Sequence, residues 1–180
     1  LGTPDFAIPT AEALAVASSC TLLGIMTKPD EPVGREQDLT APPLAVWARE
    51  NNITLWQPAT KPELTALLQK LKPDVAVVIA YGKIIPPEAL TIPRFGFVNL
   101  HPSLLPKYRG PSPIHTAIAN GDAVTGVSLM LLDAEIDHGP ILAQERVAVP
   151  SDSTRAELEE ELAMRGASLL ARTLPDYLAG

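Results

Sequence analysis

The sequence has 180 residues, of which 46% are hydrophobic, which suits one domain whose core folds without disulfides or metal ions to stabilise it. Its formal net charge of -7 argues against broad, nonspecific attraction to nucleic acid. Its single cysteine, Cys20, excludes a disulfide framework and a cysteine-based zinc site, and fits a soluble protein of the reducing cytoplasm. No apolar run reaches the roughly 18 residues that a membrane span needs, so we expect no membrane association.

In the first half of the chain, apolar strand-like runs alternate with helical ones. The first helix is expected from Thr10, and because a strand should precede this turn in a βαβ fold, we expect the native start to lie a few residues upstream of Leu1. The pattern then predicts strands over 21–27, 53–58 and 74–80 and helices over 42–52 and 63–71, the second helix led by a capping box of Thr60 and Glu63. Residues 28–42 are predicted to form a long irregular connection, which in a compact domain is usually functional or mobile.

The alternation continues in the second half. It predicts strands over 95–100, 126–132 and 145–150 and a short helix over 112–121. A last helix is expected to begin at a capping box of Thr154 and Glu157 and to pack against the core through a stripe of leucines. This order predicts an α/β fold: a Rossmann-like, mostly parallel twisted sheet with helices on both faces. One domain is expected to cover residues 1–180, with its ligands beyond the carboxyl ends of the strands.

The stretch NLHPSLLPKYRG, residues 99–110, is a candidate site because it gathers an amide, an imidazole, a hydroxyl and two cations directly after an apolar strand. A second polar cluster, DAEIDHGP, occupies 133–140. An Asn amide offers two donors, and a carboxylate beside an imidazole fixes its orientation, so Asn99, His101 and one acid could stabilise an oxyanion and move a proton. Among Asp133, Glu135 and Asp137 we favour Asp137, because D-x-G-P turns the chain sharply.

Several common chemistries have no motif here. There is no GxGxxG after a strand, no GxxxxGK[ST], no HExxH and no GxSxG, which removes the usual support for hydride transfer, NTP hydrolysis, zinc proteolysis and serine hydrolysis. His115 and His138 are expected to be structural or exposed, and Trp47 and Trp56 to be packing residues.

The candidate site also resembles a known family. The stretch NLHPSLLPKYRGPSPI is similar to the formyltransferase signature N-x-H-x-S-L-L-P-x-x-R-G, and the 38 positions from Asn99 to Asp137 match the Asn-to-Asp spacing of that family. Four further segments most closely resemble methionyl-tRNA formyltransferases: LGTPDFAIP, KPDEPVGR, AYGKIIP and NGDAVTGVSLMLLDAEIDHGPIL. The resemblance is co-linear and runs from end to end.

The resemblance implies the formyltransferase fold and transfer of a formyl group from 10-formyltetrahydrofolate to the methionine amine of initiator methionyl-tRNA, in translation initiation. It implies that Asn99 donates to the oxyanion, that His101 donates beside it or relays a proton, and that Asp137 orients His101 and helps, through water, to deprotonate the amine. It implies no metal, and a monomer is our default expectation.

The same resemblance implies the residues around the two substrates. The folate would lie against Ile84, Ile85 and the 133–137 loop, with Asp133 and Ser103 beside it, although Ser103 could equally cap a turn. Residues 2–6 would face the amino-acid end of the acceptor, which makes substrate-binding residues of Thr3 and Phe6, although the residues themselves suggest only a turn before a helix. Arg35 and Arg109 complete the acceptor side, and for Arg109 we favour ordering of the loop over catalysis.

Two departures keep alternatives open. Methionyl-tRNA formyltransferases usually carry basic residues in the loop that approaches the acceptor stem, whereas here Arg35 stands against Glu31, Glu36 and Asp38. The family also carries a basic β-barrel after the catalytic domain, so we expect this chain to be the catalytic domain without it. The alternatives are a formyltransferase acting on a nucleotide sugar or glycinamide ribonucleotide, a formyltetrahydrofolate hydrolase, and an inactive folate-binding module.

Overall fold

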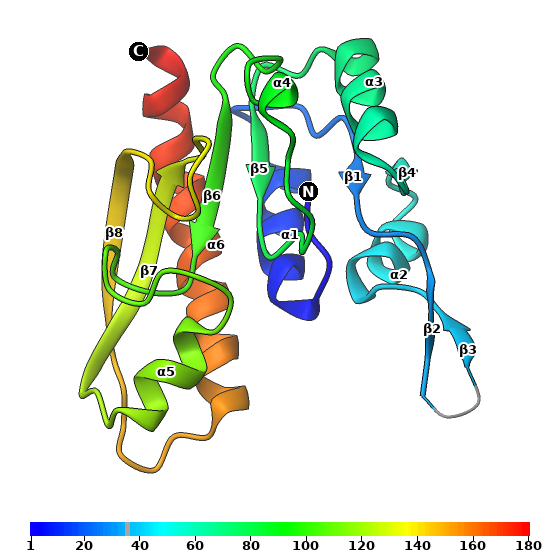
Figure 1. The fold of residues 1–180 in the computed structure, drawn as a ribbon. Coiled ribbons are helices and arrows are strands. Elements are labelled where there is room, and N and C mark those ends of the chain that lie inside the picture. The colour runs from blue at the N-terminus through cyan, green and yellow to red at the C-terminus, as the bar shows by residue number, and fades with distance from the viewer. Residues whose placement is uncertain (35–36) are drawn as a thin grey trace.

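The computed structural model describes residues 1–34 and 37–180 and has a twisted sheet at its centre (Figure 1). Four strands are hydrogen-bonded in the order β5-β6-β7-β8, and two others, β1 and β4, pair beside them. The strands are β1 (Ile25–Met26), β4 (Leu55–Trp56), β5 (Ala76–Val78), β6 (Phe97–His101), β7 (Val124–Leu131) and β8 (Ile141–Ala148).

The first residues of the chain join these two groups of strands. The Leu1 amine donates to the Val77 carbonyl at 2.6 Å and the Leu1 carbonyl accepts from Ile79 N–H at 2.9 Å, which is parallel pairing with β5. On the other side, Gly2 N–H donates to the Met26 carbonyl at 3.0 Å. Residues 1 and 2 therefore act as a short strand between β1 and β5, and the hydrogen bonding runs without interruption from β4 to β8.

The predicted α/β fold with a mostly parallel sheet is confirmed, and the antiparallel pairs lie together at one edge of the sheet. The pairs β1–β4 and β5–β6 are parallel, whereas β6–β7 and β7–β8 are antiparallel. Parallel neighbours need a crossover of a dozen or more residues, usually a helix, and the nine residues between β7 and β8 contain none. The second polar cluster occupies this connection.

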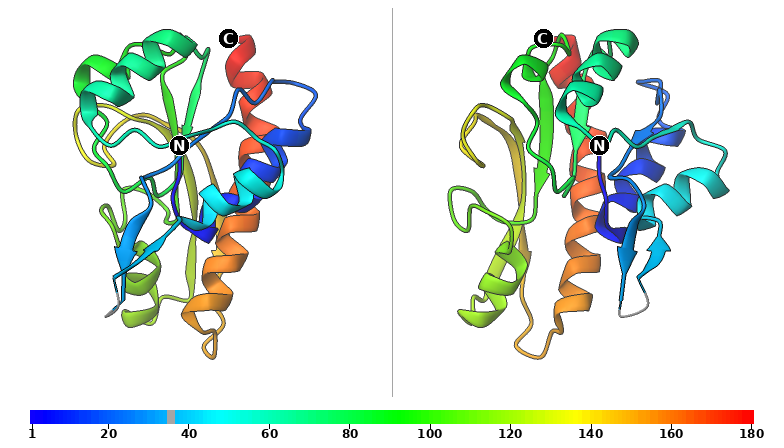
Figure 2. Two further views of the ribbon diagram at one scale, coloured as in Figure 1. Left: turned by 90° about the vertical axis from the view of Figure 1, so that its right-hand side faces the viewer. Right: turned by 45° about the vertical axis from the view of Figure 1, so that its right-hand side comes forward.

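Helices cover both faces of the sheet, as predicted (Figure 2). One face packs η1, α1, α2 and α6 against alternate strand residues such as Val98 and Leu100, and the other packs α3 and α4 against Phe97 and its neighbours. No helix within the described residues is long and apolar enough to cross a bilayer. The helices are η1 (Asp5–Ala7), α1 (Ile8–Val16), α2 (Pro43–Glu50), α3 (Lys61–Leu71), α4 (Pro87–Leu90), α5 (Pro113–Ala119) and α6 (Arg155–Ala179).

Local differences from the predicted elements have local causes. The first helix begins before Thr10, because η1 leads directly into α1. The capping box of Thr154 and Glu157 forms as predicted, but the Glu63 carboxylate accepts from Ala59 N–H, one residue before the N-cap Thr60. The predicted strand over 21–27 contracts to β1, since only Ile25 and Met26 find partners on β4.

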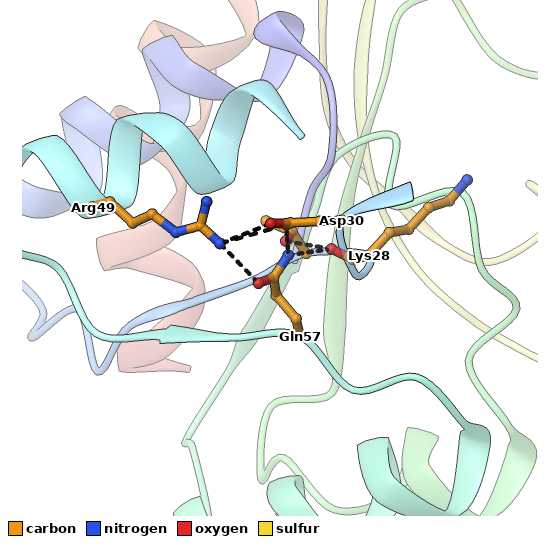
Figure 3. A network of polar contacts seen from close by, with 5 residues as sticks. Lys28, Asp30, Arg49 and Gln57 are labelled. Carbon is orange, nitrogen blue, oxygen red and sulfur yellow. Dashed lines mark hydrogen bonds and ion pairs between the residues drawn. The ribbon is translucent and has the colours of Figure 1, made fainter. Parts of the chain in front are cut away.

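The predicted irregular connection over 28–42 is wrong in part, because it contains an exposed antiparallel hairpin of β2 (Glu31–Val33) and β3 (Asp38–Thr40). The hairpin extends away from the sheet (Figure 1). A polar network fixes its root, as Figure 3 shows: Gln57 Nε2 donates to Asp30 Oδ1 at 2.7 Å and to the Lys28 carbonyl at 2.8 Å, and Arg49 pairs with Asp30 at 3.3 Å. The hairpin therefore leaves the domain in a defined direction.

Candidate active site

Strand β6 places the first two candidate residues. Asn99 and His101 are two positions apart on a strand, so both side chains leave the same face of the sheet, about 7 Å apart along it. Val98 and Leu100 point to the opposite face and are buried against the helices there. Asn99 is 8% exposed and His101 is 6% exposed, so these polar side chains are held in a largely water-excluded position at the carboxyl end of β6.

The imidazole of His101 is held by a backbone carbonyl. Its Nε2 lies 3.0 Å from the carbonyl oxygen of Tyr108, and because a carbonyl can only accept, Nε2 must carry the proton of that hydrogen bond. Nδ1 is then the free nitrogen, and it lies 3.7 Å from Oδ2 of Asp137. In neutral His101, Nδ1 carries a lone pair; in the imidazolium form, its proton faces the carboxylate.

Asp137 reaches this place by an unexpected route. Because β7 is antiparallel to β6, its carboxyl end lies at the start of β6, where Leu132 N–H donates to the Phe97 carbonyl. The connection over 132–140 must therefore fold back toward His101. On its return the connection passes so close to the end of β7 that a Cβ at Gly139 would collide with the Leu131 carbonyl, so only glycine fits there.

The carboxylate of Asp137 is fixed by the loop that follows β6. Its Oδ2 accepts from Gly110 N–H at 2.8 Å, and the side chain is 13% exposed. We expected Asp137 to orient His101; in the structure the Tyr108 carbonyl holds the ring, while Asp137 lies at ion-pair rather than hydrogen-bond distance. The structure thus brings His101 and Asp137 together, with Asn99 on the same face of β6 and the 102–110 loop bonded to both members of the pair.

The amide of Asn99 remains available to a ligand. Within residues 1–34 and 37–180, no side-chain hydrogen bond engages this amide. Nor is either amide atom among the fully enclosed polar atoms without a partner, which in the same part of the chain are Thr10 Oγ1 and Tyr81 Oη. Both amide atoms thus keep access to solvent although the residue is mostly buried. An amide with two free donors at this position could serve a developing oxyanion.

The buried side chain of Ser103 stabilises the conformation of the 102–110 loop. Its hydroxyl is fully buried and donates to the Lys107 carbonyl at 2.7 Å, so of its two expected roles the structure supports the turn. Beneath it, Ser128 Oγ donates to the Ser103 carbonyl at 2.6 Å and accepts from Leu105 N–H at 3.1 Å and Gln144 Nε2 at 2.8 Å. These bonds tie the 102–110 loop to β7 and β8.

Asp133 makes a pair that the sequence analysis missed. His138 Nδ1 donates to Asp133 Oδ2 at 2.9 Å, and Asp133 Oδ1 accepts from Glu135 N–H at 2.8 Å. The hydrogen bond from His138, and to a smaller extent that from Glu135, hold the pKa of Asp133 below its usual range. In turn, the Asp133 carboxylate raises the pKa of His138 above its usual value. The pair lies on the rim, since the His138 side chain is 49% exposed.

Arg109 is exposed, and its charge helps to lower the pKa of Asp133. In the part of the chain that the structure describes, no carbonyl accepts a hydrogen bond from its side chain, so the expected ordering of the loop by Arg109 is not seen. Arg35, the other basic residue expected on the acceptor side, lies outside the described residues.

The remaining binding residues lie in mixed surroundings. Ile84 is 70% exposed, whereas its neighbour Ile85 is buried in the core beside α4. The Thr3 hydroxyl donates to the Tyr81 carbonyl at 2.8 Å and fastens the amino-terminal segment to the loop after β5. Phe6 is 6% exposed and packs among core residues, so the structure gives its ring a packing role.

A large cavity lies away from these residues. It measures about 430 Å³, is open to solvent on one side, and is lined by the segments 19–26 and 71–77 together with α1 and the end of α6. Its lining is mainly apolar and includes none of Asn99, His101 and Asp137. We base the candidate site on the polar cluster, because apolar volume alone supplies no group that could transfer a proton or stabilise charge.

Comparison with known proteins places this arrangement among its relatives. A family described as formyl transferase matches residues 2–174. A methionyl-tRNA formyltransferase of Chloroflexus aurantiacus is 46% identical over 182 aligned positions, which cover 100% of this chain and 58% of the relative. The chain thus spans less than two thirds of the length of that curated relative.

Solved structures share the fold. A phosphoribosylglycinamide formyltransferase from Bacillus halodurans superposes with a TM-score of 0.79 at 24% identity, over 99% of this chain and 93% of that one. WlaRD, a sugar 3N-formyl transferase solved in the presence of dTDP and 5-N-formyl-THF, superposes with a TM-score of 0.70 at 20% identity, over 99% and 61%. At these identities the likeness establishes the fold alone.

Proposed function

Because this chain belongs to the formyl transferase family, we propose that it is the catalytic domain of an enzyme that transfers a formyl group from 10-formyltetrahydrofolate to the methionine amine of initiator methionyl-tRNA. The observation that carries the proposal is the cluster at the end of β6: an unengaged Asn99 amide, a His101 ring fixed through Nε2, and the Asp137 carboxylate facing Nδ1. The identity to the curated relative, with its greater length, supports the acceptor and a further domain beyond this one.

Asn99 supplies the oxyanion donor in this proposal. When an amine attacks the formyl carbon, negative charge develops on the formyl oxygen, and an amide N–H already in place stabilises that charge without reorganising. Burial strengthens the effect, since Asn99 is only 8% exposed and water competes poorly there. Removal of one such donor typically lowers the rate by about 10² to 10³.

His101 and Asp137 handle the proton. The Tyr108 carbonyl keeps the proton on Nε2, so Nδ1 is the nitrogen that can accept a proton or, once protonated, donate one to the leaving nitrogen. Asp137, 3.7 Å from Nδ1, stabilises the imidazolium form by its charge and accepts a proton through water. An α-amino group has a pKa of about 7.7, so a useful fraction of the acceptor amine is neutral near pH 7 without a strong base.

The surroundings fit the two substrates in outline. Ile84 and Ile136 expose 70% and 73% of their surface, and apolar side chains open to solvent at the loops after β5 and β7 offer contacts to a flat ring such as a pterin. We propose that the folate binds along these loops, with Asp133 on the rim. On the acceptor side we retain Thr3, Phe6, Arg35 and Arg109 as proposals, although Phe6 would have to act from the core.

The test is an assay of the chain with 10-formyltetrahydrofolate and methionyl initiator tRNA that measures formyl-methionyl-tRNA and free formate in parallel. We expect transfer by the wild type, a loss on the order of 10² or more for Asn99→Ala, His101→Ala and Asp137→Ala, and no loss for the half-exposed control Glu159→Ala. Formate without transfer would replace the proposal by a hydrolase. Transfer only to glycinamide ribonucleotide or an amino sugar nucleotide would overturn the acceptor.

A further inference from the structure

A separate set of polar residues ties the 102–110 loop to the connection between α5 and β7. Asp122 accepts from Lys107 Nζ with both oxygens, at 2.9 and 2.8 Å, and from Tyr108 Oη at 2.7 Å. Asn120 Nδ2 donates to the same tyrosine oxygen at 2.8 Å, and the Lys107 ammonium lies 4.7 Å from the centre of the Tyr108 ring. One carboxylate thus grips two consecutive residues of the loop.

The same tyrosine holds the candidate catalytic imidazole. The backbone carbonyl of Tyr108 accepts the Nε2 proton of His101 at 3.0 Å, while its side-chain hydroxyl is bound to Asp122. Tyr108 has a φ of +59°, a conformation that costs energy for a residue with a bulky side chain and persists only where the surroundings enforce it. The contacts of its side chain are thus among those that hold this backbone conformation, in which the carbonyl faces His101.

Asp122 is well suited to this task because its own backbone is fixed. It lies between α5 and β7, two residues before the strand, and its N–H donates to the Ala117 carbonyl at 3.0 Å. Its side chain is 17% exposed, and the bonds from Lys107 and then Tyr108 hold its pKa below its usual range. The carboxylate is thus an ionised anchor on a rigid junction.

We propose that Asp122 is a positioning residue for the reaction: through Lys107 and the Tyr108 side chain, it fixes the carbonyl that holds His101 in its Nε2-protonated orientation, with Nδ1 toward Asp137. The catalytic part of this inference rests on the proposed function, and the orientation of the ring can be measured without it. The effect of Asp122 on the rate would come from geometry, because a misplacement of about 1 Å in a catalytic group can lower the rate about 10²-fold.

Two variants separate the contacts. Asp122→Ala removes all three bonds to the anchor, and Tyr108→Phe removes one hydroxyl but keeps the ring and the carbonyl. Glu159→Ala is the matched control, since it deletes a half-exposed acidic partner of Arg155 on α6, away from the loop. For Asp122→Ala we expect kcat to fall about tenfold or more with KM within about twofold, because positioning of a proton-transfer group affects the transition state more than substrate binding.

The decisive readout is the ring of His101, followed by nitrogen NMR on histidine-labelled protein and assigned among the three histidines with His101→Gln. The wild type and Glu159→Ala should show the Nε2–H tautomer, and Asp122→Ala and Tyr108→Phe should show its loss or exchange. An unchanged tautomer in both folded variants, or an unchanged kcat, would overturn the proposal. If the wild type transfers no formyl group, the proposed function fails while the NMR result still decides the positioning.

Discussion

The loop that carries the candidate site depends on one buried hydroxyl, that of Ser128. This side chain is 0% exposed and makes three hydrogen bonds: it donates to the Ser103 carbonyl and accepts from Leu105 N–H and Gln144 Nε2. In Ser128→Ala the amide of Leu105 loses its acceptor in a place that water does not reach. Gln144 keeps its second bond, to the Leu105 carbonyl at 3.0 Å.

The expected loss of stability follows from these bonds. An unsatisfied buried N–H costs about 1 to 3 kcal/mol, and loss of the bond to the Ser103 carbonyl adds about 1 kcal/mol. We therefore expect Ser128→Ala to lower the free energy of unfolding by about 2 to 4 kcal/mol, read from urea denaturation with an unchanged m value. The exposed Ser151→Ala should change it by less than about 0.5 kcal/mol. A loss below about 1 kcal/mol for Ser128→Ala would refute the reasoning.

Two further predictions concern the fold. Gly166→Ala should destabilise despite a gain in helix propensity of about 1 kcal/mol, because the new Cβ would lie 2.5 Å from the buried Leu100 Cδ2; higher stability in thermal unfolding would contradict this. Thr154→Ala should cost about 1 kcal/mol through the lost N-cap, and equal urea midpoints for the two proteins would argue against it.

The parts of the site that could be predicted from sequence depend on short-range pattern. An apolar run that ends in Asn99 and His101 predicts both the strand and the shared face, since period-two alternation is local information. The same holds for the final helix, whose cap and leucine spacing are local. Ser128 also leaves a signal, because it is a polar residue inside an otherwise apolar strand, although alternation alone does not tell which loop it supports.

What could not be predicted depends on contacts between distant segments. Nothing local in VTGVSLML states that β7 runs antiparallel to β6, and the direction decides from which end Asp137 must return. The hydrogen bond from His101 to a backbone carbonyl could not be predicted either. Every residue has such a carbonyl, so the residue types give no sign of which one accepts the bond. The pairing of Asp133 with His138 is intermediate: five positions apart in a turn, they could meet, and only the fold shows that they do.

The packing of α1 against α6 has a consequence for how the chain is made. Both helices contribute to one core cluster, which joins Phe6 and Ala11 at one end of the sequence to Leu170 and Leu174 at the other. During synthesis at about 5 to 20 residues per second, the early apolar residues therefore wait on the order of ten seconds for their partners to leave the ribosome. Throughout that interval the apolar residues of the unfinished core stay exposed, which opens a window for aggregation that closes only when α6 packs.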